Sequence, residues 1–242
     1  MNKAELDKIT EGILSILKRD GFISESKSGS TQAETGSEQG PAEAAVPRSP
    51  FKRDPMLVPV AITGRRAVLC EKDMRSLFGN TDLHRDECLS AGRMVVYQET
   101  VNVCGPDGDI TDVHVCASED NESQVELLSG DNLILGINAP LRLTGDIENS
   151  PGIRIASTSG SIELKEGAII PIRKVEISPE KAEKLGLSKG QIVSVEVSGS
   201  RGGVFTNVAV IIKDGADGFC HLDENEANAM CISRATWVKI IK

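Results

Sequence analysis

The sequence is poor in aromatic residues, carries no excess of basic charge and contains no long apolar run. Aromatic side chains make up 3% of the 242 residues, too few for a platform on which nucleic-acid bases stack. The formal net charge is −9, which repels a phosphate backbone, and no basic stripe offsets it. No apolar run reaches the roughly 18 residues of a membrane span. We therefore expect neither a nucleic-acid partner nor a membrane partner.

The cysteine pattern indicates a reducing compartment. Six cysteines are present without any CxxC pair, and charged residues interrupt the apolar residues at the N-terminus, unlike in a secretory signal. We expect reduced thiols in a cytoplasmic protein.

The first fifth of the chain differs in composition from the rest. Residues 1–20 carry apolar side chains at spacings of three and four, which predicts an amphipathic helix. Residues 21–55 are rich in Ser, Gly and Pro, which predicts a disordered linker. A tethered amphipathic helix is typical of a peptide that docks on a partner. Alternatively, the helix packs on its own domain or forms a coiled dimer. The sequence therefore leaves open whether the protein is a homo-oligomer.

The remaining residues, 56–242, predict a mainly β fold of two barrels with short capping helices, in halves 56–165 and 166–242. Short helices are expected near residues 71–78, 179–185 and 224–229. Strand-like runs separated by turn signals occupy residues 57–62, 94–103, 113–116, 124–128, 141–144, 153–156, 169–172, 191–197, 204–212 and 236–241.

Two stretches of this part resemble each other. Each has an apolar strand, a basic pair (residues 65–66 and 173–174), alternating residues and a helix start. Cys70 and Ser178 occupy the matching cap positions, and Ser178 is the better cap, with Pro179 in the first helical position. The shared offset favours a duplicated unit over chance similarity.

The same stretches resemble the two signature strands of the microcompartment phosphate propanoyltransferases (PduL-type phosphotransacylases), which read R-H-x-H. Motifs of that family also match, in order, at residues 123–126, 135–140, 151–153 and 220–229. The resemblance implies paired β-barrel domains that transfer an acyl group between coenzyme A and phosphate, using zinc. It also implies an N-terminal helix that targets the protein into a bacterial microcompartment.

The resemblance places the family's zinc ligands on this sequence. Glu126 and His221 keep the ligand types, whereas four of the family's five metal histidines are replaced, by Arg66, Val68, Lys174 and Glu176. Arginine and protonated lysine have no lone pair to offer, and valine has no donor atom. One carboxylate and one imidazole do not make a zinc site. A cation in the place of zinc is expected to pair with Glu126 or Glu176.

The positions implied for phosphate and coenzyme are also changed. The family's phosphate-binding arginine aligns with Asp120, and a lysine that contacts the coenzyme aligns with Asp107. Both changes reverse the charge. The family's other coenzyme positions fall on Ile62, Thr63, Gly64, His114 and Asn228.

Three cysteines are candidates for a rebuilt metal site: Cys70, Cys116 and Cys220. His114 and Cys116 share a strand face, whereas Cys220 and His221 face opposite ways on a strand. The other interpretation of each cysteine is a small buried apolar residue.

These observations predict a degenerate phosphotransacylase-like protein that scaffolds or regulates in the lumen of a bacterial microcompartment, in the cytoplasm. Residues 1–20 are expected to dock on a shell or cargo protein, and no cofactor is expected. The alternative is an active phosphate acyltransferase with an atypical metal site, which converts acyl-CoA and phosphate into acyl phosphate and coenzyme A. Zinc and coenzyme A are its implied cofactors.

Overall fold

The computed structural model describes residues 54–86, 95–118 and 122–242, all within one compact unit of the chain, 44–242. The helix and almost all of the linker expected in residues 1–55 lie outside the described residues, as does Asp120. The mainly β fold with short helices is confirmed. No helix among the described residues combines the length and the apolar character of a membrane span.

Six strands form a closed barrel, in the order β1 (Leu57–Thr63), β13 (Asp217–Asp223), β10 (Lys174–Ile177), β12 (Gly203–Ile212), β11 (Ile192–Val197) and β14 (Trp237–Ile241). Their alternating pattern directs one face inward, where buried aliphatic side chains such as Val175, Val195 and Val210 fill the interior. Side chains at the intervening positions, such as Lys174, therefore lie outside this barrel.

The other eight strands form a second sheet that curls over its own core. Their order is β6 (Leu141–Arg142), β9 (Ala168–Pro171), β5 (Gln124–Glu126), β2 (Arg66–Leu69), β4 (Asp109–Ala117), β3 (Val96–Cys104), β7 (Ile153–Ala156) and β8 (Ser161–Leu164). Ala67, Val115 and Val125 face that core. Arg66 and Glu126, their neighbours in sequence, consequently project from the opposite face.

Four short helices occur in the described part of the chain: α2 (Glu71–Phe78), α3 (Asp131–Leu135), α4 (Pro179–Leu185) and α5 (Glu224–Ala229). Three of them match the expected helices, and α3 was not expected. Ser178 caps α4 by accepting a hydrogen bond from the Lys181 backbone N–H, whereas Cys70 makes no such bond at the start of α2. Gly79 and Gly186 end α2 and α4 in the left-handed conformation.

The strand pairing supports the expected duplication. In the first copy, β2 pairs in parallel with β4 and antiparallel with β5. In the second copy, β10 pairs in the same way with β12 and β13. The helices follow the same plan, because α2 and α4 come after β2 and β10, and α3 and α5 come after β5 and β13. Arg66 and Lys174 are thus equivalent, as are Glu126 and His221.

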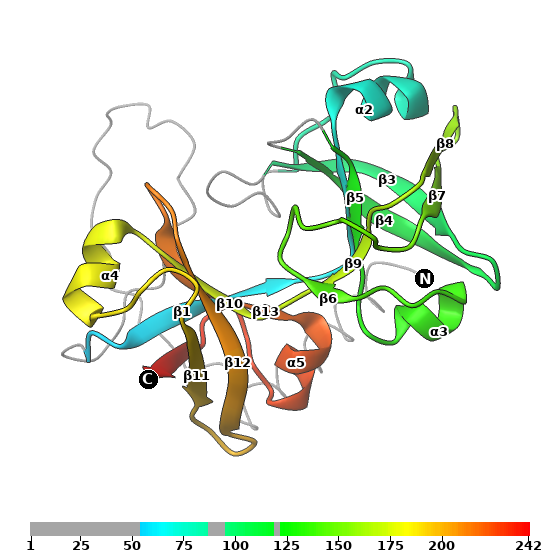
Figure 1. Cartoon of the computed structure of the whole chain (residues 1–242). Helices are drawn as coiled ribbons and strands as arrows, with labels where there is room; N and C mark the ends of the chain where they lie inside the picture. The colour runs from blue at the N-terminus through cyan, green and yellow to red at the C-terminus, as the bar shows by residue number, and fades with distance from the viewer. Residues whose placement is uncertain (1–53, 87–94, 119–121) are drawn as a thin grey trace, which may run out of the picture. The chain divides into compact units, whose positions relative to one another are not determined.

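The two copies exchange one strand. The strand that precedes the basic pair leaves its own copy: β1 pairs in parallel with β13, and β9 pairs in parallel with β5. In Figure 1, β1 is the cyan strand among the yellow, orange and red strands of the barrel. A boundary between residues 165 and 166 therefore does not separate the strands of the two sheets, because β1 belongs to the barrel and β9 to the eight-stranded sheet.

Candidate functional site

Two equivalent strand starts bring the candidate residues together. Arg66 begins β2 and Lys174 begins β10, and each lies opposite a residue of the neighbouring antiparallel strand. Arg66 is in register with Glu126, and Lys174 is in register with His221. The duplication thus presents four of the predicted metal positions, one pair from each sheet.

Glu126 is the most enclosed of these residues, with no exposed surface. Its Oε2 accepts a hydrogen bond from Arg66 Nε in an ion pair. Its Oε1 accepts two more, from Gln124 Nε2 at 2.9 Å and from Thr144 Oγ1 at 2.8 Å. A buried carboxylate needs such partners to offset the loss of water. The ion pair expected between a replacement cation and Glu126 is therefore present.

Lys174 and His221 form the second pair of the site. Lys174 Nζ lies 3.6 Å from Glu176 Oε2, so the second expected ion pair is also present. Burial, and then the positive charges of Lys174 and Arg66, lower the pKa of His221 to about 3. The imidazole of His221 is therefore neutral at pH 7.

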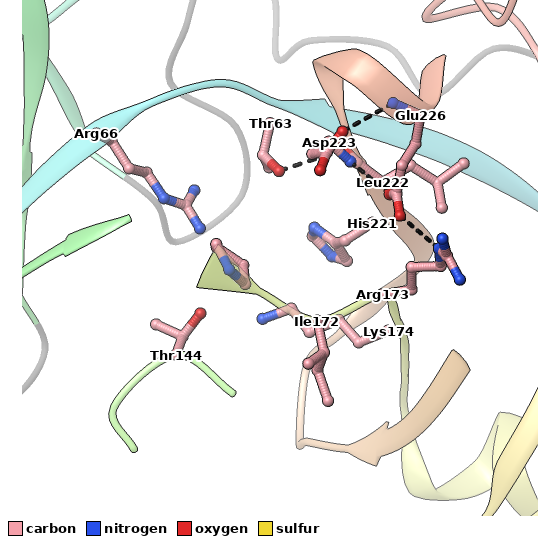
Figure 2. A pocket seen from close by; sticks show the side chains of 11 residues that line it. Thr63, Arg66, Thr144, Ile172, Arg173, Lys174, His221, Leu222, Asp223 and Glu226 are labelled. Carbon is pink, nitrogen blue, oxygen red and sulfur yellow. Dashed lines mark hydrogen bonds and ion pairs between the residues drawn. The ribbon is translucent and has the colours of Figure 1, made fainter. Parts of the chain in front are cut away.

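A small pocket lies where these residues meet. Figure 2 shows Arg66, Lys174 and His221 reaching into the same space from β2, β10 and β13. The full lining consists of Thr63, Arg66, Thr144, Pro171, Ile172, Arg173, Lys174, His221, Leu222, Asp223 and Glu226. Three of these side chains are cationic and two are carboxylates.

The first residue of each basic pair has a structural partner instead. Arg65 donates to both carboxylate oxygens of Asp131, at 2.8 and 2.7 Å, where α3 begins. Arg173 donates Nε to Glu226 in the first turn of α5, and its guanidinium lies 4.8 Å from the centre of the Phe205 ring. Each copy therefore uses its first basic residue to hold a helix and its second to line the pocket, which Arg173 also borders.

The positions implied for coenzyme A are divided between the two sheets. Thr63 ends β1, where its hydroxyl donates to the Leu222 carbonyl at 3.3 Å, and Gly64 lies against the Glu224 side chain of α5. Asn228 is exposed on α5. These residues surround one end of the barrel.

The remaining coenzyme positions belong to the eight-stranded sheet. Asp107 lies in the turn between β3 and β4, close to Gly136 at the end of α3. A ring nitrogen of His114 lies 3.3 Å from the Tyr97 carbonyl oxygen. His114 on β4 is the register partner of Arg66 on β2. Neither Asp107 nor His114 lines the pocket.

Comparison with known proteins gives the chain its family. The model of the phosphate propanoyltransferase family matches residues 59–233. A phosphate propanoyltransferase of Rhodopseudomonas palustris is 35% identical over 190 residues, covering 78% of this chain and 84% of the relative. The chain belongs to the phosphate propanoyltransferase family. Relatives of the same name from Clostridioides difficile and Salmonella typhimurium are both 34% identical, over 76% and 71% of this chain and 89% and 82% of their own lengths.

The residues at the metal positions do not fit zinc. Arg66 and Lys174 bring hydrogen-bond donors and positive charge to two of them, and Val68 offers no ligand atom to a third. In the described ranges, no group of three or more His, Cys, Asp or Glu side chains is placed to bind a metal. These residue types therefore do not fit a zinc ion at the positions that the resemblance implies.

The three candidate cysteines do not converge. Cys220 faces the barrel interior, opposite to His221, and burial raises its pKa to about 12. Cys116 is buried on the face of Arg66 and Glu126, where burial raises its pKa to about 11. Cys70 lies at the start of α2, with Sγ 3.4 Å from Asp73 Oδ2. Cys116 and Cys220 are therefore protonated at pH 7, and all three cysteines are buried.

Two site residues were missed by sequence reasoning. Gln124 precedes Glu126 by two positions on β5 and so shares its face, a signal that the sequence does contain. Gln124 Oε1 also accepts the Gly145 backbone N–H at 2.8 Å, which fixes the loop that carries Thr144. Thr144 itself follows β6 and has no local pattern that points to Glu126.

Proposed function

We propose that this chain is a degenerate phosphate propanoyltransferase that has exchanged its metal chemistry for a structural ion pair. The observation that most supports this proposal is the ion pair between Arg66 and the fully buried Glu126, at two positions where the family binds its metal. Lys174 stands at the equivalent position of the second copy, beside Glu176. The role of the whole protein is then that of a scaffold or regulator rather than a catalyst.

The chemistry of the family's reaction supports this proposal. Acyl transfer between a thioester and phosphate needs a group that polarises the carbonyl and stabilises the charge of the transition state. A guanidinium whose Nε is bound to Glu126 is oriented by that carboxylate. Neutral His221 has a pKa of about 3, too low for a general base near pH 7, where efficient bases have pKa values close to the working pH.

Metal analysis and an activity assay test this function together. We expect the purified full chain to contain no stoichiometric zinc and to form no acyl phosphate from acyl-CoA and phosphate. The Rhodopseudomonas palustris relative, purified and assayed in parallel, is the positive control for the assay. Stoichiometric zinc with turnover in our chain would overturn the proposal.

A restoring variant tests whether the four substituted positions are what excludes zinc. Histidines at all four complete a ligand set with Glu126 and His221, so the variant is expected to retain zinc after dialysis when the parent does not. The variant combines four changes: Arg66→His, Val68→His, Lys174→His and Glu176→His. Equal zinc contents in parent and variant contradict the assignment of these positions. Four histidines placed at exposed strand positions elsewhere control for nonspecific binding.

The second candidate is an active phosphate acyltransferase with an atypical site. The relatives' names and the retained Glu126 and His221 favour it. This function requires zinc and coenzyme A, or a mechanism without metal in which Arg66 or Lys174 stabilises the developing charge. The same assay separates the two candidates, because only this one predicts phosphate-dependent consumption of acyl-CoA.

The proposed location is the lumen of a bacterial microcompartment, with residues 1–20 docking on a shell or cargo protein. The support is the apolar spacing of residues 1–20 and the composition of residues 21–55. A fluorescent protein fused to residues 1–20 and expressed with shells is expected to concentrate in them. Diffuse fluorescence, equal to that of a fusion with Ile9 and Ile13 changed to Asp, would contradict docking.

A further inference from the structure

One lysine on α4, away from the pocket, is half-buried and has no partner of opposite charge. Lys181 lies in the first turn of α4, whose Ala182 and Leu185 pack into the barrel core. The side chain of Lys181 makes no hydrogen bond or ion pair with any residue in the described ranges. Every fully buried side-chain nitrogen or oxygen in those ranges does have a partner, so the Lys181 amine must retain access to solvent. The amine is therefore partly stripped of water but still open to a small molecule.

A glycine makes room for this amine. Gly218, near the start of β13, is buried and has a φ of 84°. A methyl group on its Cα would stand 2.6 Å from Lys181 Nζ, closer than non-bonded atoms approach each other. Any side chain at this position would therefore push the amine toward solvent. The place of the amine against the backbone of β13 also explains why burial alone lowers the pKa of Lys181.

The first copy of the duplicated unit has a different pair of residues at these two places. Three residues after its helix cap, the first copy has Asp73 where the second has Lys181. Three residues before its candidate metal ligand on the neighbouring strand, the first copy has Ser123 where the second has Gly218. The Ser123 hydroxyl donates a hydrogen bond to Asp73 Oδ2 at 2.6 Å. The second copy therefore has an amine without an acceptor where the first has a carboxylate with its donor.

We propose that Lys181 is a site of covalent modification by activated acyl compounds, either thioesters or acyl phosphates. Loss of water is one way in which a lysine becomes a nucleophile. The neutral nitrogen attacks the carbonyl carbon, so a C–N bond forms and the bond from that carbon to sulfur or to the phosphate oxygen breaks. The thiolate or phosphate leaves with the electron pair, and the proton released from nitrogen passes to water. The product is a neutral amide, so acylation removes one positive charge where α4 meets β13.

Mass spectrometry of individual lysines tests the proposal on the full chain. The protein is incubated at pH 7.5 with acetyl phosphate or with S-acetyl-N-acetylcysteamine, a small thioester. The remaining amines are then acetylated with a deuterated reagent, so that the occupancy of each lysine can be followed over time. Lys184, exposed on the same helix, is the internal control. We expect Lys181 to react at least about threefold faster than Lys184 with one or both donors, and the faster donor identifies the preferred acyl source. Equal or slower reaction of Lys181 with both donors would overturn the proposal.

A variant of Gly218 tests whether the close approach of the amine to β13 is the cause. Asparagine tolerates a positive φ better than most residues, and the atoms that its Cβ would meet belong to the flexible end of Lys181. Gly218→Asn should therefore displace the amine into water and lower the acetylation rate of Lys181 to that of Lys184, with the Lys184 rate unchanged. Circular dichroism and Tm show that the variant is folded. An unchanged Lys181 rate in the folded variant contradicts the proposal.

The pH dependence of the same rates gives a second test that needs no variant. Because its pKa is lowered, the Lys181 amine should reach its full reactivity at a lower pH than the amine of an exposed lysine. We expect the Lys181 rate, measured from pH 7 to 11, to level off at a lower pH than the Lys184 rate; coincident profiles would contradict the proposal. This inference does not depend on the proposed function, because neither zinc content nor turnover enters either test.

Discussion

Neutralising Glu126 should destabilise the fold strongly, although the change is nearly isosteric. In Glu126→Gln, the amide oxygen can replace Oε1 and keep the hydrogen bonds from Gln124 and Thr144. The amide NH₂ then replaces Oε2 and faces the Nε–H of Arg66, so that two donors meet. Arg66, 14% exposed, is left as a cation without this carboxylate.

The expected cost follows from the burial of the pair. Removing one partner of a buried ion pair costs about 3–5 kcal/mol, and we take about 3 kcal/mol because Arg66 borders the pocket. For a domain of this size, that lowers Tm by about 6–12 °C. Calorimetry and denaturant unfolding measure both quantities.

Two further variants make the test specific to a buried pair. Glu71→Gln removes the partner of Arg75 from a surface pair in which both side chains are more than half exposed, and should cost at most about 0.5 kcal/mol. Adding Arg66→Met to Glu126→Gln should recover part of the loss, because the buried cation that lost its carboxylate partner is then gone. A Glu126→Gln protein that melts together with the parent and Glu71→Gln would refute the reasoning.

Three smaller predictions concern a titration, a helix cap and a helix anchor. Between pH 6.5 and 3 the unfolded chain protonates His221 and the folded chain does not. The free energy of unfolding should therefore decrease as the pH is lowered, by up to about 1.4 kcal/mol per pH unit. A difference in unfolding free energy between parent and His221→Gln that is constant from pH 7.5 to 4.5 contradicts this. Ser178→Ala should lose about 1 kcal/mol through the cap of α4, and an unchanged Tm argues against the cap. Asp131→Asn should lower the free energy of unfolding by about 1–2 kcal/mol, because Arg65, although 36% exposed, donates two hydrogen bonds to this carboxylate. In a double-mutant cycle, recovery of that stability on adding Arg65→Met would confirm the pairing.

Features with local causes could be predicted from the sequence. The bounds of α4 follow from Ser178 and Pro179 at its start and Gly186 at its end, residues whose backbone preferences act within one turn. The duplication was visible because the basic pair and the helix start keep their offset. The pairing of Arg66 with Glu126 could be expected from charge alone once both were assigned to one site.

Features with distant causes could not be predicted in this way. The exchange of β1 and β9 depends on which strand each one pairs with, and that partner lies far along the chain. β13 was missed because its residues, Asp217–Asp223, include a glycine and polar side chains, and its strand character comes from neighbours on both sides. Thr144 reaches Glu126 through the same kind of long-range packing.

The proposed loss of the metal gives the retention of Glu126 a physical reason in the charges around it. A divalent ion bound near this carboxylate would contribute two positive charges, and Arg66 and Lys174 together contribute the same number. Lys174 turns to Glu176 on its own strand because its register partner is His221, an imidazole that stays neutral beside two cations. The first copy, by contrast, has a carboxylate in the equivalent place, so Arg66 pairs across the strands. Losing Arg66 alone would leave Glu126 buried with only neutral donors, which costs more than losing the pair. The cation and the carboxylate therefore constrain each other, and substitutions at these two positions should be tolerated together and not singly.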